Sequence, residues 1–189
     1  MRVIYELRIA GYANNQIKRE NSPIKNIVLD LSNNGGGQYR RSHICDRVVS
    51  GEADIALRDT FTGAETNAMY LADVNLDGGY DEKDHVGAGY KLYCLTTNNS
   101  FSCGNLVPAA CQSSGKVTLI GQTTGGGACA VLPCTTAAGT VFQISGNRQI
   151  SIIKKDHSIT QTQGLNPPFS WTSRNHSMTG RRLWNICMS

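Results

Sequence analysis

The sequence predicts a single α/β domain, and three observations support this prediction. Apolar runs of strand length alternate with segments of helical periodicity, as in domains where helices cover a sheet. One of these runs, "IKNIVLDL" at 24–31, holds Ile27, Val28 and Leu29 consecutively, which favours a strand buried on both faces. The length of 189 residues is enough for one domain with a sizeable core.

The first half of the chain predicts a helix over 2–20, the strand at 24–31 and a helix over 39–51. Between the last two lies the loop "SNNGGGQ", whose glycine triplet allows backbone angles that other residues avoid. A short strand is expected at 53–59. Residues 60–88 are polar and are expected to be irregular.

The second half predicts a strand at 90–97, a helix over 103–113 and a strand at 116–121 that leads into a second glycine loop, "QTTGGG". Three short strands should follow, at 129–134, 140–145 and 148–155, with one turn at Gly139 between the first two and a tight hairpin turn at Gly146 and Asn147 between the last two. The prolines of "GLNPPFSW" favour an extended segment near the end of the chain.

Composition excludes several classes of protein. The net charge of +4 is mild and its basic residues are scattered, so we expect no nucleic-acid partner. No apolar run approaches the roughly 20 residues that span a bilayer, so we expect no membrane span. The seven cysteines include no C-x-x-C pair, which makes a zinc site improbable, and several of them sit in apolar contexts as small buried side chains.

A candidate nucleophile lies in "NNSFSCGN", where Ser102 precedes the predicted helix at 103–113. The first N–H groups of a helix lack partners within it, so the N–H of Cys103 can stabilise an oxyanion while Ser102 attacks a carbonyl. Glycine N–H groups of the 35–37 triplet can supply a second donor. The alternative is that Ser102 is an ordinary helix N-cap and that both glycine loops are tight turns.

Four stretches resemble, in order, the motifs of the C-terminal processing and tricorn-type serine proteases. "IVLDLSNNGGG" is similar to their "DLRxNxGG" element, "YCLTTNNSFSCGNLVPAAC" to their strand and nucleophile helix, "VTLIGQTTGGG" to their following strand and turn, and "QGLNPPFS" to their closing "GxxPD" segment. The resemblance covers about residues 2 to 172. It implies a crotonase-like and Clp-protease-like fold with a central mixed sheet and flanking helices.

The resemblance also implies roles for individual residues. Ser102 falls on the nucleophile, while Cys103 with Gly36 or Gly37 falls on the oxyanion donors. The lysine base of the processing proteases falls at or near Gly127, so this base is missing.

The tricorn-like branch instead takes a histidine from a segment upstream of the first motif, oriented by a glutamate that falls here on Gln161 or a neighbour in "TQTQG". A neutral amide stabilises an imidazolium less than a carboxylate does. Among the four histidines, His157 is the nearest substitute for the base because it lies close to the closing segment. Cys103 as a thiol nucleophile is a remote alternative.

A second motif, "DVNLDGGYDEKD", matches a calcium-binding loop over 73–84 and resembles the loops of dockerins. Hard oxygen ligands at alternate positions wrap a cation whose charge offsets their mutual repulsion. The expected ligands are Asp73, Asn75, Asp77, Asp81 and Asp84, with the backbone carbonyl of Gly79. The alternative is an acidic surface turn. A calcium clip of this kind suits millimolar calcium outside cells.

These observations predict that residues 1–189 form one serine peptidase domain, the C-terminal half of a larger secreted or cell-surface bacterial protease, containing a calcium loop at 73–84. Its substrate would be a peptide or an unfolded protein. Two alternatives stay open. One is a catalytically silent relative that binds peptides without a competent base. The other is a calcium-dependent, dockerin-like interaction module.

Overall fold

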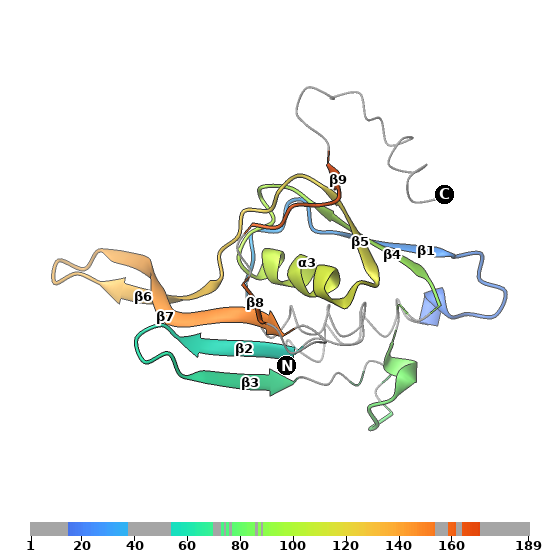
Figure 1. Ribbon diagram of the computed structural model, residues 1–189, viewed down its shortest axis with the longest axis horizontal. Coiled ribbons are helices and arrows are strands. Elements are labelled where there is room, and N and C mark those ends of the chain that lie inside the picture. The colour runs from blue at the N-terminus through green and yellow to red at the C-terminus, as the bar shows by residue number, and fades with distance from the viewer. Residues whose placement is uncertain are drawn as a thin grey trace.

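The computed structural model describes residues 15–37, 54–69, 73, 75, 77–85, 87, 89–153, 159–161 and 164–170. Within these residues, two sheets lie on either side of one helix, α3 (Cys103–Ser114) (Figure 1). The helix expected at 39–51, most of that expected at 2–20, and the C-terminal residues after 170 lie outside the described part of the chain. None of the described helices is long and apolar enough to cross a membrane.

The first sheet is parallel and has the strand order β1-β4-β5-β9. Its strands are β1 (Asn26–Asp30), β4 (Lys91–Thr96), β5 (Val117–Gly121) and β9 (Phe169–Ser170). The expected strands at 24–31, 90–97 and 116–121 are therefore confirmed. Because β1, β4 and β5 run in the same direction, the loops that follow them leave the same edge of the sheet.

One expectation about this sheet is wrong. The apolar run at β1 suggested a strand buried on both faces, but β1 is the edge strand of the described sheet, and Val28 is 45% exposed. The described strands of this sheet with neighbours on both sides are β4 and β5, and in β4 Leu92, Tyr93 and Cys94 are all buried.

The second sheet is antiparallel, with the order β3-β2-β7-β6 and with β8 also paired to β7. Its strands are β2 (Asp54–Asp59), β3 (Glu65–Met69), β6 (Cys129–Thr135), β7 (Val141–Ile153) and β8 (Ile159–Gln161). The α/β class is thus confirmed, although the described strands form one parallel and one antiparallel sheet where a single mixed sheet was expected. The strand β3 corrects the expectation that all of 60–88 is irregular.

The hairpin turn expected at Gly146–Asn147 is also wrong, because β7 runs unbroken through both residues. The turn expected at Gly139 is confirmed: it joins β6 to β7 at 136–140, where Thr136 N–H donates to the Thr140 carbonyl and Gly139 takes a φ of 83°. Gly146 instead marks a register shift in the pairing of β6 with β7, and a Cβ there would meet the Leu132 side chain at 2.9 Å. Glycine in a strand often marks such a bulge.

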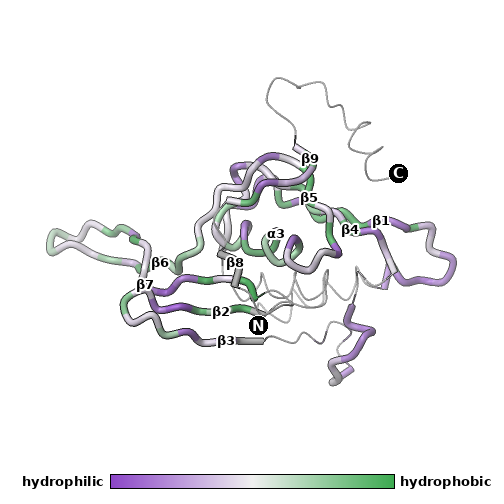
Figure 2. The backbone as a smooth tube through the Cα atoms, in the orientation of Figure 1, coloured by the Kyte–Doolittle hydropathy of each residue, from purple (hydrophilic) through white to green (hydrophobic). Residues whose placement is uncertain are grey.

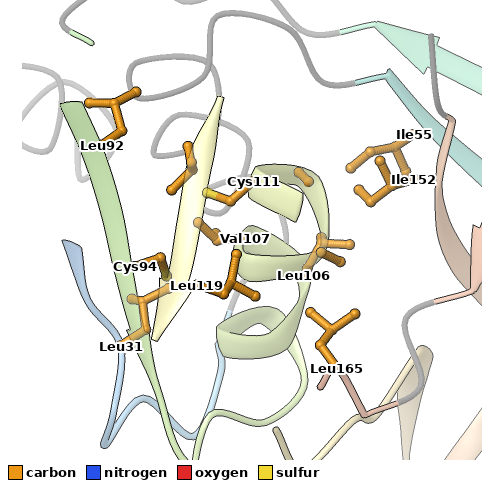
Figure 3. Packing of buried hydrophobic residues seen from close by; sticks show 13 residues of the cluster. Leu31, Ile55, Leu92, Cys94, Leu106, Val107, Cys111, Leu119, Ile152 and Leu165 are labelled. Atoms are coloured by element: carbon orange, nitrogen blue, oxygen red, sulfur yellow. The ribbon is translucent and has the colours of Figure 1, made fainter. Parts of the chain in front are cut away.

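The hydrophobic core gathers around α3 (Figure 3). The helix contributes Leu106, Val107 and Cys111, the parallel sheet contributes Leu92, Cys94 and Leu119, and the antiparallel sheet contributes Ile55 and Ile152. Figure 2 shows hydrophobic residues along α3, β4 and β5 and hydrophilic residues in the loop near η1 (Glu82–Asp84). The helix α3 is therefore packed against residues of both sheets.

Candidate active site

Ser102 has an unusual backbone conformation directly before α3. Its φ is 55° and its ψ is −123°, a region that non-glycine residues rarely occupy and that costs about 1–3 kcal/mol. Its side chain makes no capping hydrogen bond, so the interpretation of Ser102 as a side-chain N-cap is wrong. A serine held on a strained strand-to-helix turn is the arrangement that exposes the hydroxyl of a nucleophile elbow.

Hydrogen bonds on both sides keep Ser102 in this conformation. Its N–H donates to the Gly126 carbonyl at 2.7 Å, and its own carbonyl accepts from Asn105 N–H at 2.8 Å and Leu106 N–H at 3.0 Å. Ser102 is therefore anchored through its N–H to the second glycine loop and through its carbonyl to the first turn of α3.

The residues between β4 and Ser102 are tied to the end of β1. The buried Ser100 hydroxyl donates to the Leu31 carbonyl at 2.7 Å and accepts from Thr97 N–H at 3.0 Å, while the Thr97 hydroxyl donates to the Ser32 carbonyl. These bonds join the loops that leave two neighbouring strands. They explain why the polar "TTNNSF" follows a buried strand without leaving its backbone unsatisfied.

The first glycine loop passes directly over Ser102. A Cβ on Gly36 would lie 2.7 Å from Ser102 Cβ, 2.9 Å from the Phe101 carbonyl oxygen and 3.1 Å from the backbone nitrogen of Cys103. Gly36 also has a φ of 103°, so both its conformation and the lack of space require glycine. The structure thus brings the pair Ser102 and Cys103 next to the glycine triplet at 35–37, which is far away in the sequence.

The two glycines expected to act as oxyanion donors differ in their contacts. The N–H of Gly36 donates to Asn34 Oδ1 at 3.0 Å, so in this structure it is already engaged. The carbonyl of Gly37 accepts a hydrogen bond from Cys103 Sγ at 3.1 Å, which joins the loop to the start of α3. The role of each glycine in stabilising an oxyanion stays a prediction.

The second glycine loop closes the other side of the turn. Gly125 N–H donates to the Ser100 carbonyl at 3.0 Å, and Gly126 forms a parallel bridge with Phe101. A Cβ on Gly127 would lie 2.8 Å from the Phe101 ring and 3.1 Å from Ser102 N. Gly127, at or near which the sequence resemblance places the lysine base, therefore lies beside Ser102, and the space that a side chain would take there is filled by the Phe101 ring.

An open hollow of about 600 Å³ lies next to this turn, lined by Asn33, Gly35, Asn98, Asn99, Phe101 and Gly125. Its walls carry asparagine amides and one aromatic ring that is 48% exposed, and no charged side chain.

A buried polar network that sequence reasoning missed attaches the closing segment to the site. The Thr124 hydroxyl donates to Asn105 Oδ1 at 2.5 Å and accepts from Leu165 N–H at 2.6 Å, and Thr124 N–H donates to the Leu165 carbonyl at 3.1 Å. Asn105 and Thr124 are both buried. The sequence signal that could have revealed this network is Asn105, a polar residue one turn after Ser102.

The expected orienting residue and bases are less defined. Gln161 lies in β8, opposite Ser151 of β7, and its side chain is outside the described residues. His157, His43 and His176 also lie outside the described part of the chain. His85 follows η1 at the end of the acidic loop. The general base therefore stays a prediction.

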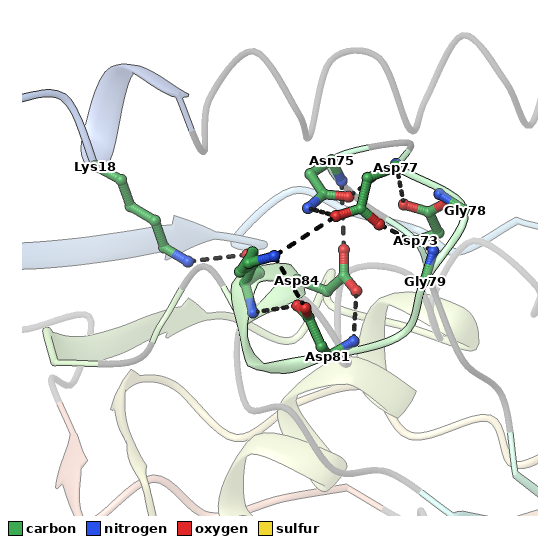
Figure 4. Close-up of polar contacts among 9 residues, drawn as sticks. Lys18, Asp73, Asn75, Asp77, Gly78, Gly79, Asp81 and Asp84 are labelled. Atoms are coloured by element: carbon green, nitrogen blue, oxygen red, sulfur yellow. Dashed lines mark hydrogen bonds and ion pairs between the residues drawn. The ribbon is translucent and has the colours of Figure 1, made fainter.

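The acidic loop expected to bind calcium is held by its own carboxylates (Figure 4). Asp73 accepts from Asp77 N–H at 3.1 Å and Gly78 N–H at 2.9 Å, while the buried Asp84 accepts from Asn75 N–H at 3.3 Å and Asp81 N–H at 3.0 Å. Among the described residues, no three His, Cys, Asp or Glu side chains are grouped to hold a metal ion.

A basic side chain also enters this loop. Lys83 Nζ lies 3.3 Å from Asp81 Oδ2 and 3.9 Å from Asp77 Oδ2. The hydrogen bond from Gly79 N–H, followed by that from the Asn75 side chain, holds the pKa of Asp77 below its usual value. Asp77 is therefore favoured in its ionised form, and Lys83 offsets part of the negative charge of the loop.

Comparison with known proteins identifies the family. The sequence model of Peptidase family S41 matches residues 10–170. The chain belongs to this family. The match includes both glycine loops, Ser102 and the closing segment, so the prediction of a serine peptidase domain is confirmed and the interaction-module alternative is not favoured.

Individual proteins are also similar to this S41 domain, one in sequence and others in structure. A protein from Chlamydia pneumoniae is 32% identical over 140 residues, which cover 64% of this chain and 21% of that protein. A putative S41 protease from Bacteroides fragilis has a TM-score of 0.67 at 17% identity, covering 98% of this chain and 48% of its own. The photosystem II D1 C-terminal processing protease has a TM-score of 0.64 at 15% identity. This match covers 98% of this chain and 44% of that protease. The chain therefore spans less than half the length of each.

Proposed function

We propose that Ser102 is the nucleophile of this S41 peptidase domain and that its substrate is a peptide or an unfolded polypeptide. The observation that carries the proposal is the strained conformation of Ser102, held without a side-chain capping bond, under a glycine loop that leaves no room for a Cβ. Strain of this kind persists only where the surrounding structure imposes it, and it is concentrated at functional sites.

The proposed reaction is acyl transfer. The Ser102 oxygen attacks the peptide carbonyl carbon while its proton passes to a general base, and the carbonyl oxygen becomes an oxyanion stabilised by the Cys103 N–H and the glycine loop. The C–N bond then breaks and the amine takes up the proton. Water hydrolyses the acyl-enzyme by the same steps in reverse order, which regenerates the serine.

A fluorophosphonate probe in large excess tests the nucleophile directly, because its reactive phosphorus–fluorine bond phosphonylates the serine irrespective of peptide specificity, even at the slow rate expected without the general base. We expect one probe to add to the wild type at Ser102, as located by mass spectrometry of peptides. The Ser102→Ala variant should not react, whereas Ser113→Ala, at the other end of α3, should react as the wild type does. Equal labelling of wild type and Ser102→Ala would overturn the proposal.

The general base is the part of the mechanism for which we propose a source outside the described residues. With Gly127 in place of a lysine, the isolated chain should hydrolyse peptides slowly, because losing a general base typically costs about 10²–10⁴ in rate. Robust hydrolysis that is abolished by Ser102→Ala would instead place the base within this chain. His157 would then be the first residue to replace.

We further propose that the loop 73–84 binds calcium. The side chains of Asp73, Asn75, Asp77, Asp81 and Asp84 offer an oxygen-only donor set, which is the chemistry that calcium prefers. Because no group of three acidic side chains is drawn together in the described loop, binding would require these oxygens to converge and Lys83 to withdraw. This rearrangement argues for weak binding, suited to the millimolar calcium of an extracellular or cell-surface protein.

Thermal unfolding with and without calcium tests this second proposal. A ligand that binds only the folded state raises its stability in proportion to ln(1 + [L]/Kd). We expect millimolar calcium to raise the Tm of the wild type and to have no effect on Asp73→Ala. An exposed acidic residue outside the loop, Glu65, provides the matched control Glu65→Ala. Extracellular sites bind calcium with a Kd of up to ~10⁻³ M. If the wild-type Tm is unchanged at a calcium concentration about 10-fold above this value, the calcium proposal is rejected.

A further inference from the structure

We propose that Asn34 is a positioning residue for the reaction at Ser102, and that it acts by clamping the glycine loop to the nucleophile turn. The inference rests on the proposed role of Ser102. Asn34 directly precedes the glycine triplet at 35–37.

Asn34 holds the loop through its side chain. Its Oδ1 accepts the N–H of Gly36 at 3.0 Å, a turn in which an asparagine side chain replaces a backbone acceptor. Gly36 is the residue whose Cβ position lies 2.7 Å from Ser102 Cβ. The side chain of Asn34 therefore fixes the orientation of the peptide unit that faces the candidate nucleophile.

Asn34 holds the nucleophile turn through its backbone. Its carbonyl accepts the N–H of Phe101, the residue before Ser102, at 3.0 Å, and its own N–H donates to the Leu31 carbonyl at 3.1 Å. The same carbonyl and Oδ1 lie against Gly104 in the first turn of α3, where a Cβ would overlap the carbonyl oxygen. One residue thus contacts the loop, the turn and the helix at once.

The clamp also determines which glycine can act on an oxyanion. With the Gly36 N–H engaged by Asn34, the donor from this loop is the N–H of Gly37, whose carbonyl is itself held by Cys103 Sγ at 3.1 Å. Donors stabilise an oxyanion only when they are aimed at its position before the reaction starts. If Asn34 is removed, the loop loses the bond that orients Gly36 and, through it, Gly37.

The neighbouring residue Asn33 offers a matched control. It is the same residue type in the same loop, but its Oδ1 accepts from Asn99 Nδ2 at 3.4 Å, whereas the N–H of Gly36 donates to Asn34. Asn33→Ala removes an equal volume from the loop without removing the clamp.

The experiment measures two quantities on the 189-residue chain. The first is amide hydrogen exchange of Gly36 by NMR, which reports the clamp whether or not Ser102 reacts. The second is the rate of fluorophosphonate labelling against probe concentration, which separates the maximal rate from the apparent affinity. For Asn34→Ala we expect Gly36 to exchange at least ~10-fold faster and the maximal labelling rate to fall about 10–100-fold, somewhat less than the loss of an oxyanion donor, with the apparent affinity little changed. Asn33→Ala should match the wild type in both.

Two further variants distinguish positioning from structural support. Asn34→Ser keeps a hydroxyl acceptor for Gly36 N–H and should recover part of the labelling rate. Asn34→Asp keeps the acceptor but places a negative charge near the developing oxyanion. Its rate relative to wild type should rise as the pH falls toward about 4, where the carboxylate is protonated. A merely structural residue would not show this pH dependence.

The outcomes separate the two proposals. Unchanged Gly36 exchange in Asn34→Ala overturns the clamp. Faster exchange with an unchanged labelling rate overturns the positioning role but leaves Ser102 as the nucleophile. Failure of the wild type to label overturns the proposed nucleophile itself, and with it the catalytic meaning of the clamp, while the exchange data still decide whether the clamp exists.

Discussion

Gly104 lies so close to Asn34 that a Cβ at position 104 would overlap the Asn34 backbone carbonyl oxygen. The start of α3 and the first glycine loop are therefore in direct backbone contact. This contact places the N-terminus of the helix, with its partial positive charge and its N–H groups, beside the loop. A glycine two residues after Ser102 is thus a requirement of the site and not a flexible point in the helix.

The first prediction concerns this contact. Gly104→Ala should destabilise the domain by about 1–3 kcal/mol, because the new methyl group must displace backbone atoms. Helix propensity alone predicts the opposite sign, a gain of about 1 kcal/mol. Urea unfolding measures the difference. Gly35→Ala is the control, since its Cβ would meet no described atom within 4 Å and its φ is not positive. A stabilised Gly104→Ala variant would contradict the contact.

The second prediction concerns the strain at Ser102. Ser102→Gly should raise the unfolding free energy by about 1 kcal/mol, because glycine occupies a φ of 55° and a ψ of −123° without steric cost. In a domain of this size the Tm should rise by about 2–4 °C. Ser102→Ala keeps the Cβ and should leave stability almost unchanged. Both variants should lose fluorophosphonate labelling, so a gain in stability would accompany a loss of function. Equal Tm values for all three proteins would mean that Ser102 is not strained.

The third prediction concerns pH and the turn between β2 and β3. Hydrogen bonds from Thr62 N–H and Phe61 N–H hold the pKa of Asp59 below its usual value. A carboxyl whose pKa is lowered on folding adds stability that is complete above its unfolded pKa of about 4 and is lost as the pH falls through the lower folded value. The stability difference between wild type and Asp59→Asn should therefore shrink below about pH 4. Chemical unfolding at pH 7 and pH 3 measures it, and a constant difference would exclude the mechanism.

The sequence allowed the elements around the site to be predicted because their signals are local. The apolar runs of β4 and β5 and the glycine triplets at 35–37 and 125–127 need no knowledge of tertiary contacts to be recognised. The order of these signals along the chain also indicated the family. Their meeting point at Ser102 followed from parallel strands, whose loops leave the same edge of the sheet.

Other features could not be predicted because tertiary contacts decide them. The strand β3 has a polar sequence, and its residues Glu65, Thr66 and Asn67 are all exposed. It forms because it pairs with β2. Gly146 has the sequence of a turn but lies in a strand, because β6 continues its pairing on both sides of the register shift. The clamp by Asn34 depends on Phe101 and Gly104, which are about 70 positions away, so no local pattern reports it.

The last prediction concerns the buried network that joins the second glycine loop to the closing segment. Thr124→Val keeps the shape of the side chain but removes the hydroxyl that donates to Asn105 Oδ1 and accepts from Leu165 N–H. Losing hydrogen bonds in a buried site should cost about 1–3 kcal/mol. Amide exchange of Leu165 should accelerate more than that of the core strands, because the segment 164–167 loses its side-chain attachment.

The neighbouring threonine provides the control for this prediction. The Thr123 hydroxyl donates to Asn166 Oδ1 at 2.8 Å on the exposed side of the same loop, so Thr123→Val should change stability by less than about 0.5 kcal/mol. Urea unfolding and hydrogen exchange of both variants decide the point. Since Asn105 lies one turn after Ser102 on α3, Thr124→Val should also slow fluorophosphonate labelling, whereas Thr123→Val should not. Equal effects of the two variants would show that the buried hydroxyl has no special part in holding the closing segment against the nucleophile helix.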